Sequence, residues 1–260
     1  MLATNRRSPY TFKILGLCGC LATLSGCSQT TKQPDCSNVT YEVNDPVESL
    51  NRKVFAFNRV ADDYAIKPVA RGYAKLPQPV QDGVHNFVSN FAEPNVLVND
   101  VLQGNGIRAM TTLSRFTINT ILGIGGIFDT AGRMGLARHD ADFGQTFGVW
   151  GVGNGATLEW PLLGSANSRD SVGRVLDLAF SPFGSGNSDT VDTLDTAQNV
   201  VGIVDRRAAA LPLTNTLENE PDYYSALRDN VGQRRAYFVA EGRSGKPTPD
   251  ELYKSCGFAE

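Results

Sequence analysis

The sequence predicts an all-α domain with glycine-rich loops behind a lipid-anchored N-terminus. Two observations predict the helices. Apolar residues recur at steps of three and four over 47–64 and 191–211, which places them on one face of a helix, and the strict alternation typical of strands is scarce. A third observation, the order of residue types over positions 1–27, predicts the anchor.

Residues 1–26 are typical of an export signal. Arg6, Arg7 and Lys13 give a basic start, and an apolar run at 14–24 follows. This run is too short for a bilayer core, which needs roughly 20 helical residues. Leu24-Ser25-Gly26-Cys27 matches the lipobox of bacterial lipoprotein signals. We therefore expect cleavage before Cys27, a diacylglyceryl group on its thiol and an acyl chain on its new amino end; the alternative is an ordinary secretory signal with a chance cysteine.

Composition limits how residues 27–260 could stay at a membrane. Removing residues 1–26 takes away three basic residues and no acidic one, so 21 Lys and Arg remain against 27 Asp and Glu, a net charge of −6. This balance argues against binding nucleic acid and against electrostatic adhesion to anionic lipids. No segment approaches 18 unbroken apolar residues, so we expect no transmembrane helix. The acyl chains must therefore hold the protein. By the sorting rule of bacterial lipoproteins, Ser28 after the anchor permits transfer to the outer membrane.

Four segments are expected along the chain: the signal peptide at 1–26, a lipidated polar tether at 27–43, a helical domain at 44–240 and a C-terminal tail at 241–260. Cys36 and Cys256 remain after cleavage and acylation. In an oxidising compartment they could form a disulfide that joins the two ends of the chain, or they could stay as free or buried thiols.

The first helices are predicted from caps and prolines. Asp45, with Pro46 and Glu48, has the pattern of a capping box that opens a helix ending at Lys67-Pro68. A second helix starts at 77–79 and is expected to break at Glu93-Pro94, with a short helix over 95–102. A further helix covers 107–121.

The second half of the chain is richer in glycine. Residues 122–128 form an apolar, glycine-rich segment that is either a buried turn or a loop that dips into lipid. Residues 143–164 are interpreted as loops with short turns. Helices are expected again at 169–180, 188–210 and 221–240.

The sequence offers no catalytic residue, cofactor site or metal site. His85 and His139 are the only histidines, and neither has a distinctive serine nearby. His139 with Asp140 and Asp142 is a weak metal candidate, because three loop residues lack a fourth ligand. No stretch has the glycine pattern and following helix that phosphate or dinucleotide binding requires.

Four polar residues in apolar surroundings are more suggestive. Arg115 and Asn119 lie one helical turn apart in an apolar segment, and Asn99 and Asp100 end another. Buried polar groups need partners. These four residues could tie helices together, or they could line a wet cavity.

Several short stretches are distinctive when taken together; they run in order over about 45–170, and weaker ones follow beyond 180. They are Asp45-Pro46 with Glu48, Asn51-Arg52, Phe57-Asn58, Lys67-Pro68-Val69-Ala70, Pro77 with Pro79-Val80, Asn86-Phe87 with Asn90, Glu93-Pro94, Val98-Asn99, Leu102-Gln103-Gly104, Arg115-Phe116, Ile118 to Gly123, Gly125-Gly126, Phe128-Asp129, Phe143 to Thr146 with Gly148, Gly151-Val152-Gly153, Pro161 to Gly164 and Arg169-Asp170. In these stretches the chain resembles the VacJ/MlaA family of outer-membrane lipoproteins.

The resemblance implies a flat ring of amphipathic helices in the inner leaflet of the outer membrane, on its periplasmic face, with a central amphipathic channel. It implies phospholipid as the cargo, and trimeric porins and a soluble periplasmic lipid carrier as partners. The implied function is removal of misplaced phospholipid from the outer leaflet. Under this hypothesis Asn99, Asp100, Arg115 and Asn119 are candidate channel-lining residues, and the only covalent groups are the acyl chains on Cys27.

Two other functions stay open. The chain could be a structural lipoprotein that binds porins or envelope polymers without moving lipid, or a periplasmic hydrolase. Substitution of Arg115 and Asn119 separates the first alternative from transport, because only a conduit predicts a rise in outer-leaflet phospholipid. A hydrolase predicts turnover in detergent.

Overall fold

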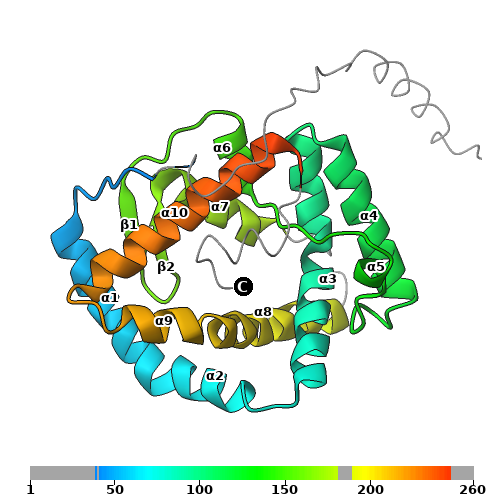
Figure 1. Cartoon of the computed structure of the whole chain (residues 1–260), viewed down its shortest axis with the longest axis horizontal. Coiled ribbons are helices and arrows are strands. Elements are labelled where there is room, and N and C mark those ends of the chain that lie inside the picture. Colours follow the sequence, from blue (N-terminus) through cyan, green and yellow to red (C-terminus); the bar gives the residue numbers. More distant parts are fainter. Residues whose placement is uncertain (1–38, 40, 181–188, 247–260) are drawn as a thin grey trace, which may run out of the picture. The chain divides into compact units, whose positions relative to one another are not determined.

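The computed structural model describes residue 39 and residues 41–180 and 189–246. The chain divides into residues 1–30, none of them described, and residues 31–260, to which all that follows applies. Cys27, Cys36 and Cys256, with the predicted anchor and disulfide, lie outside the described residues. The described part is mostly helical, as predicted (Figure 1). The closed ring and its channel stay predictions.

The first helical segment is longer than the sequence predicts. α1 (Glu48–Ala61) passes into a π-helical turn, η1 (Asp62–Ile66), and then into α2 (Lys67–Tyr73). Pro68 does not end the helix, because it stands in the first turn of α2, where the missing N–H is tolerated. The predicted cap at Asp45 is wrong: Val47 occupies the N-cap position without a side-chain bond. Asp45 instead accepts hydrogen bonds from Asn51, Tyr224 and Arg228.

α3 (Gln78–Leu102) also exceeds its prediction. It begins where Pro77 and Pro79 indicate, but it continues through Pro94 instead of breaking there. An internal proline removes one helical hydrogen bond and costs about 3 kcal/mol. Packing on both sides offsets this, because α3 lies along α4 (Gly106–Ile121) and against α8 (Asp189–Ala209). Asn105 caps α4 by accepting a hydrogen bond from the Arg108 amide.

The 122–128 segment turns tightly between α4 and α5 (Thr130–Arg133). A Cβ on Gly123 would stand 2.3 Å from the Phe128 carbonyl oxygen, and one on Gly126 2.4 Å from Asn90 Cβ. Only glycine therefore fits either position without a shift. Ile124 and Leu122 are exposed at the outside of the same turn. The segment is thus a close-packed turn with an exposed apolar rim.

The interpretation of residues 143–164 as loops with short turns is wrong. These residues contain α6 (Phe143–Val149) and β1 (Thr157–Trp160), and β1 pairs in antiparallel fashion with β2 (Gly164–Asn167). α1 supports this short hairpin. Asn51 bonds to the carbonyl of Thr157 and the amide of Glu159, and Asn58 bonds to the backbone around its turn. These amides satisfy groups that a two-stranded sheet would leave to water.

The remaining helices are α7 (Ser168–Ala179), α9 (Leu211–Leu217) and α10 (Tyr223–Ser244). α7 and α8 confirm their predicted ranges within about two residues, a normal boundary difference. α10 packs on α6, β2 and α9, while α8 lies beside α2 (Figure 1). Among the described residues, no helix is both long and apolar enough to cross a bilayer.

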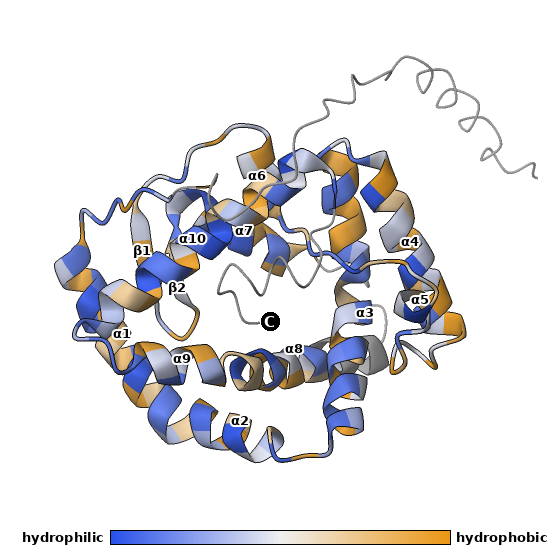
Figure 2. Ribbon diagram, in the orientation of Figure 1, coloured by the Kyte–Doolittle hydropathy of each residue, from blue (hydrophilic) through white to orange (hydrophobic). Residues whose placement is uncertain are grey.

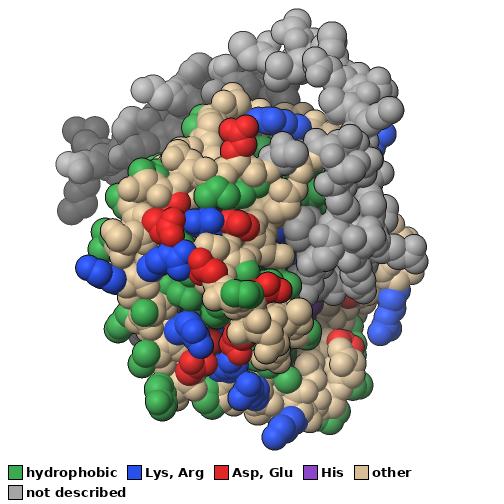
Figure 3. All heavy atoms as spheres, turned by 60° about the vertical axis from the view of Figure 1, so that its left-hand side comes forward, with side chains coloured by type: hydrophobic (Ala, Val, Ile, Leu, Met, Phe, Trp, Pro, Cys, Tyr) green, Lys and Arg blue, Asp and Glu red, His purple; other side chains and the backbone are tan. Residues whose placement is uncertain are grey.

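The interior is unusually polar. A small hydrophobic cluster of Ala70, Ala208 and Leu211 joins α2, α8 and α9. Over the described residues, however, more polar or charged side chains than hydrophobic ones are buried, while many large hydrophobic side chains are exposed. On the face shown in Figure 3, basic and acidic side chains are interspersed among hydrophobic ones. This distribution differs from that of a typical water-soluble domain, which keeps its large apolar residues inside.

Candidate functional site: an arginine-rich amphipathic cavity

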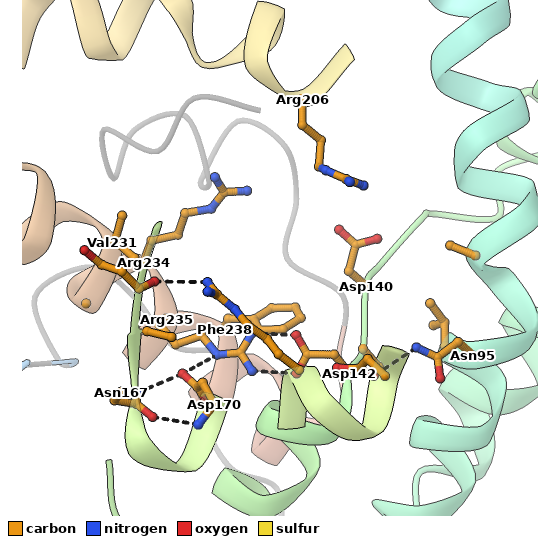
Figure 4. A pocket seen from close by; sticks show the side chains of 18 of the residues that line it. Asn95, Asp140, Asp142, Asn167, Asp170, Arg206, Val231, Arg234, Arg235 and Phe238 are labelled. Atoms are coloured by element: carbon orange, nitrogen blue, oxygen red, sulfur yellow. Dashed lines mark hydrogen bonds and ion pairs between the residues drawn. The ribbon is translucent and has the colours of Figure 1, made fainter. Parts of the chain in front are cut away.

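A cavity of about 680 Å³ opens between α3, the 138–142 segment, the β1–β2 hairpin, α7, α8 and α10 (Figure 4). One part of its wall is apolar and includes Val88, Val96 and Phe238. The other part is charged. Its arginines are Arg138, Arg174, Arg206, Arg228, Arg234 and Arg235. Its aspartates are Asp140, Asp142, Asp170 and Asp177.

Arg235 on α10 is the most firmly held of these charges. Its Nη1 and Nη2 atoms lie 2.6 and 2.5 Å from the two carboxylate oxygens of Asp142, and its Nε lies 2.8 Å from Asp170 Oδ2 (Figure 4). Burial alone would raise the pKa of Asp142, but the Arg235 charge and hydrogen bonds lower that pKa below its ordinary value. Gly144 makes room for this cluster, since a Cβ there would stand 2.4 Å from Arg235 Nη2.

Two other arginines have no carboxylate partner among the described residues. Arg174 on α7 donates to the backbone carbonyls of Leu163, Gly164 and Ser165 in the hairpin. Burial lowers its pKa, and the repulsion of Arg235 adds to this effect. Arg206 reaches into the cavity from α8 (Figure 4), where no described residue forms a hydrogen bond or ion pair with it.

The carboxyl pKa values of Asp140 and Asp177 are shifted in opposite directions. The Asp140 side chain is 62% exposed and lies 3.2 Å from Arg138, whose charge lowers the pKa of the carboxyl. Asp177 on α7 accepts a hydrogen bond from Asn95 of α3, but burial raises its pKa to about 6. Near that pH the cavity therefore has a less negative wall than its four aspartates suggest.

A series of hydrogen bonds connects Arg138 in the cavity wall to α3, α8 and α2. Arg138 Nη1 lies 2.5 Å from His85 Nε2, while His85 Nδ1 lies 2.8 Å from Asp205, which also accepts from Tyr73. With an arginine at Nε2, that nitrogen must be the acceptor, so Nδ1 carries the proton donated to Asp205. These contacts tie α8 to α2 and α3 and fix the helix that carries Arg206.

The four predicted channel residues lie elsewhere. Arg115 Nε is 3.2 Å from Glu93, and its Nη2 is 3.2 Å from Asp129, which also accepts from Asn119. All these side chains are buried except Asp129, and none of them lines the cavity. Burial raises the pKa of Glu93 to about 7 despite the nearby Arg115.

Asn99 and Asp100 are fully buried as well. Asn99 accepts from Thr146 of α6, and Asp100 accepts from Thr112 and pairs with Arg108 at 3.3 Å. The contacts of all four predicted residues favour the role of tying helices together, and their place in a channel lining stays a prediction.

α4 has its polar face turned inward. Arg108, Thr112, Arg115 and Asn119 follow at helical spacing and are buried. Ile107, Met110 and Ile121 on the same helix are 77%, 62% and 70% exposed. Figure 2 shows this mixture of hydrophilic and hydrophobic residues along α4. Helices of water-soluble proteins have the opposite orientation.

His139 is buried, and its Nε2 atom lies 2.8 Å from Asp100 Oδ2 on α3 and 3.1 Å from Thr112 Oγ1 on α4. It therefore takes part in the contacts between these helices and does not form part of a metal site in a loop. Over the described ranges, no group of three or more histidine, cysteine, aspartate and glutamate side chains is placed to hold a metal ion. The cavity arginines were not predicted from the sequence. Each lies among ordinary polar residues of its own element, and no local spacing brings them together.

Comparison with known proteins places the chain among lipoproteins. A family model described as MlaA lipoprotein matches residues 43–238. The intermembrane phospholipid transport system lipoprotein MlaA of Escherichia coli (strain K12) is 36% identical over 209 residues, covering 78% of this chain and 81% of the relative. The protein of that name from Haemophilus influenzae is 30% identical over 239 residues, covering 89% and 93%.

A solved structure gives the same result at the level of fold. It is described as the structural basis for maintenance of bacterial outer membrane lipid asymmetry. It matches with a TM-score of 0.64 and 34% identity, over 75% of this chain and 98% of the other. An uncharacterised protein of Rickettsia felis is 38% identical over 76% of this chain and 79% of its own length.

Proposed function

The chain belongs to the MlaA lipoprotein family, and we propose that it carries phospholipid between membranes as an outer-membrane lipoprotein. In this proposal it takes misplaced phospholipid from the outer leaflet and passes it to a soluble periplasmic carrier while bound to a trimeric porin. The relatives named for intermembrane phospholipid transport support the general activity. The porin, the carrier and the direction of transfer rest on the resemblance alone.

The observation that carries the proposal is the two-sided lining of the cavity. A phospholipid that passes through protein needs water or charge around its headgroup, since burying a charged group without partners costs several kcal/mol. The guanidinium group of Arg206, which no described residue binds, supplies donors that suit a phosphate. Val88, Val96 and Phe238 supply an apolar surface for the acyl chains. The chain needs no enzymatic group for such a task.

The inverted α4 supports contact with lipid. Its exposed Ile107, Met110 and Ile121 continue into the exposed Leu122 and Ile124 of the glycine-rich turn. In water this surface would be unfavourable, while in a leaflet it is matched by acyl chains. The buried polar stripe then provides hydrogen bonds within the protein, where lipid offers none. With acyl chains on Cys27, the domain would lie in one leaflet without spanning the membrane.

Blocking the cavity tests the proposal. Ala92 is an exposed residue of α3 that lines the cavity, so Ala92→Trp fills space there without displacing packed atoms. In cells that lack the native copy, we expect this variant to reach the membrane at normal levels and to leave phospholipid in the outer leaflet. Ala56→Trp, on an exposed site of α1 outside the cavity lining, is the matched control and should restore lipid asymmetry.

The outcome also separates the proposal from a purely structural role. If Ala92→Trp keeps outer-leaflet phospholipid as low as the unmodified protein does, lipid does not pass through this cavity. A structural lipoprotein that only binds porin predicts that result, since the changed side chain faces the cavity and leaves the outer surface intact.

A further inference from the structure

The charged groups that line the cavity are not all paired. Six arginines line it among the described residues. Arg138, Arg228 and Arg235 each have a carboxylate within 3.2 Å, and the one at Arg228 is Asp45, outside the cavity lining. Arg234 has an interaction of its own. Arg174 donates only to backbone carbonyls, and Arg206 has no carboxylate partner in the described part of the chain. The described wall therefore holds two cations that no described carboxylate neutralises, although residues 27–260 carry a net charge of −6.

From this imbalance we propose that the cavity selects phospholipids with a net negative headgroup, such as phosphatidylglycerol, over zwitterionic ones such as phosphatidylethanolamine. The proposal rests on the proposed function and adds the substrate class. Both lipids present a phosphate to the arginines. Only the zwitterionic lipid brings an ammonium group, which the excess positive charge repels.

The aspartates of the cavity give that ammonium group little compensation. Asp142 and Asp170 are already bound to Arg235, and Asp140 pairs with Arg138. Asp177 bonds to Asn95 and to the Phe143 amide. An incoming ammonium would have to displace these partners. An anionic headgroup displaces nothing, because Arg206 faces the cavity without a bond to any described residue.

The test measures which lipid the acylated protein takes up. Purified full chain in detergent is mixed with equimolar phosphatidylglycerol and phosphatidylethanolamine and re-isolated, and the bound lipids are quantified by mass spectrometry. We expect roughly fivefold enrichment of phosphatidylglycerol, the size that one added charge near two uncompensated cations gives in a wet cavity. The enrichment should fall at high salt.

Charge variants locate the effect. Arg206→Glu removes the excess positive charge and should bring the ratio close to one, whereas Arg206→Lys should retain the enrichment. Arg71→Glu makes the same reversal on an exposed arginine of α2 outside the cavity lining and should leave the ratio unchanged. Arg206 is itself exposed, so these variants should fold.

Each failure has a distinct meaning. Equal uptake of the two lipids by the unmodified protein, or the same ratio in Arg206→Glu and Arg71→Glu, would overturn the charge selection and leave lipid transport standing. If the protein takes up neither lipid, the proposed function itself fails.

Discussion

Replacement of Arg115 by methionine tests whether the inward polar stripe of α4 holds the fold together. The Arg115 side chain is 3% exposed and contacts Glu93, Asp129 and the carbonyl oxygen of Leu136. Methionine fills similar space without a charge, so at pH 8, above the raised pKa of Glu93, it leaves the buried Glu93 carboxylate with no cation. Removing one partner of a buried ion pair costs about 3–5 kcal/mol. At roughly 2–4 °C per kcal/mol for a chain of this size, we expect Tm to fall by about 6–20 °C.

The assay is thermal unfolding of the acylated protein in detergent, followed by circular dichroism. Arg133→Met, on an exposed arginine of α5, is the control and should change Tm little. Glu93→Gln combined with Arg115→Met should lose less than the two single changes together, because the double variant buries no unpaired charge. Equal Tm values for the Arg115 and Arg133 variants would refute a structural role. A stable Arg115→Met protein that fails to clear outer-leaflet phospholipid would support the channel role instead.

Three further predictions concern the same region. In denaturant unfolding, Gly123→Ala should lower the free energy of unfolding far more than Gly125→Ala. A Cβ on Gly123 would stand 2.3 Å from a backbone oxygen, whereas one on Gly125 meets nothing within 4 Å and adds only the strain of its positive φ, about 1 kcal/mol. Equal losses would contradict this. Glu93 has its pKa raised from 4.5 to about 7, so the folded chain keeps a proton that the unfolded chain releases, and the free energy of unfolding should fall by about 3 kcal/mol as pH rises through that window. Glu93→Gln should remove this part of the pH dependence in denaturant titrations at several pH values, and an unchanged slope would show that another group causes it. Asn105→Ala should cost about 1 kcal/mol by removing the cap of α4, and a loss near zero in the same titrations would mean that the cap contributes nothing.

Helical periodicity predicted most of the fold because it depends on neighbours within one element. It identified α4, α7 and α8 with small boundary differences. The prediction failed at Pro68 and Pro94, where the local rule that proline ends a helix did not hold. Pro68 follows a π-helical turn, and Pro94 is held by helices on both sides of α3. The β1–β2 hairpin was missed because its edge is completed by Asn51 and Asn58, about a hundred residues earlier.

The candidate site was less predictable for a related reason. Polarity in an apolar segment correctly marked Arg115 and Asn119 as unusual, and both are buried with partners. Sequence alone does not say which side of a helix faces the interior when the usual order of polarity is reversed. The cavity arginines come from the 138–142 segment and from α7, α8 and α10, so only the folded chain brings them together.

The orientation of α4 has a consequence for handling the molecule. Most surface engineering improves solubility by replacing exposed apolar residues with charged ones. Here Ile107, Met110 and Ile121 would be the obvious targets. Such changes should prevent aggregation in detergent-free buffer, yet they should also weaken the hold of the domain on a lipid leaflet. Solubility in detergent-free buffer and binding of the domain to the lipid leaflet would then change in opposite directions.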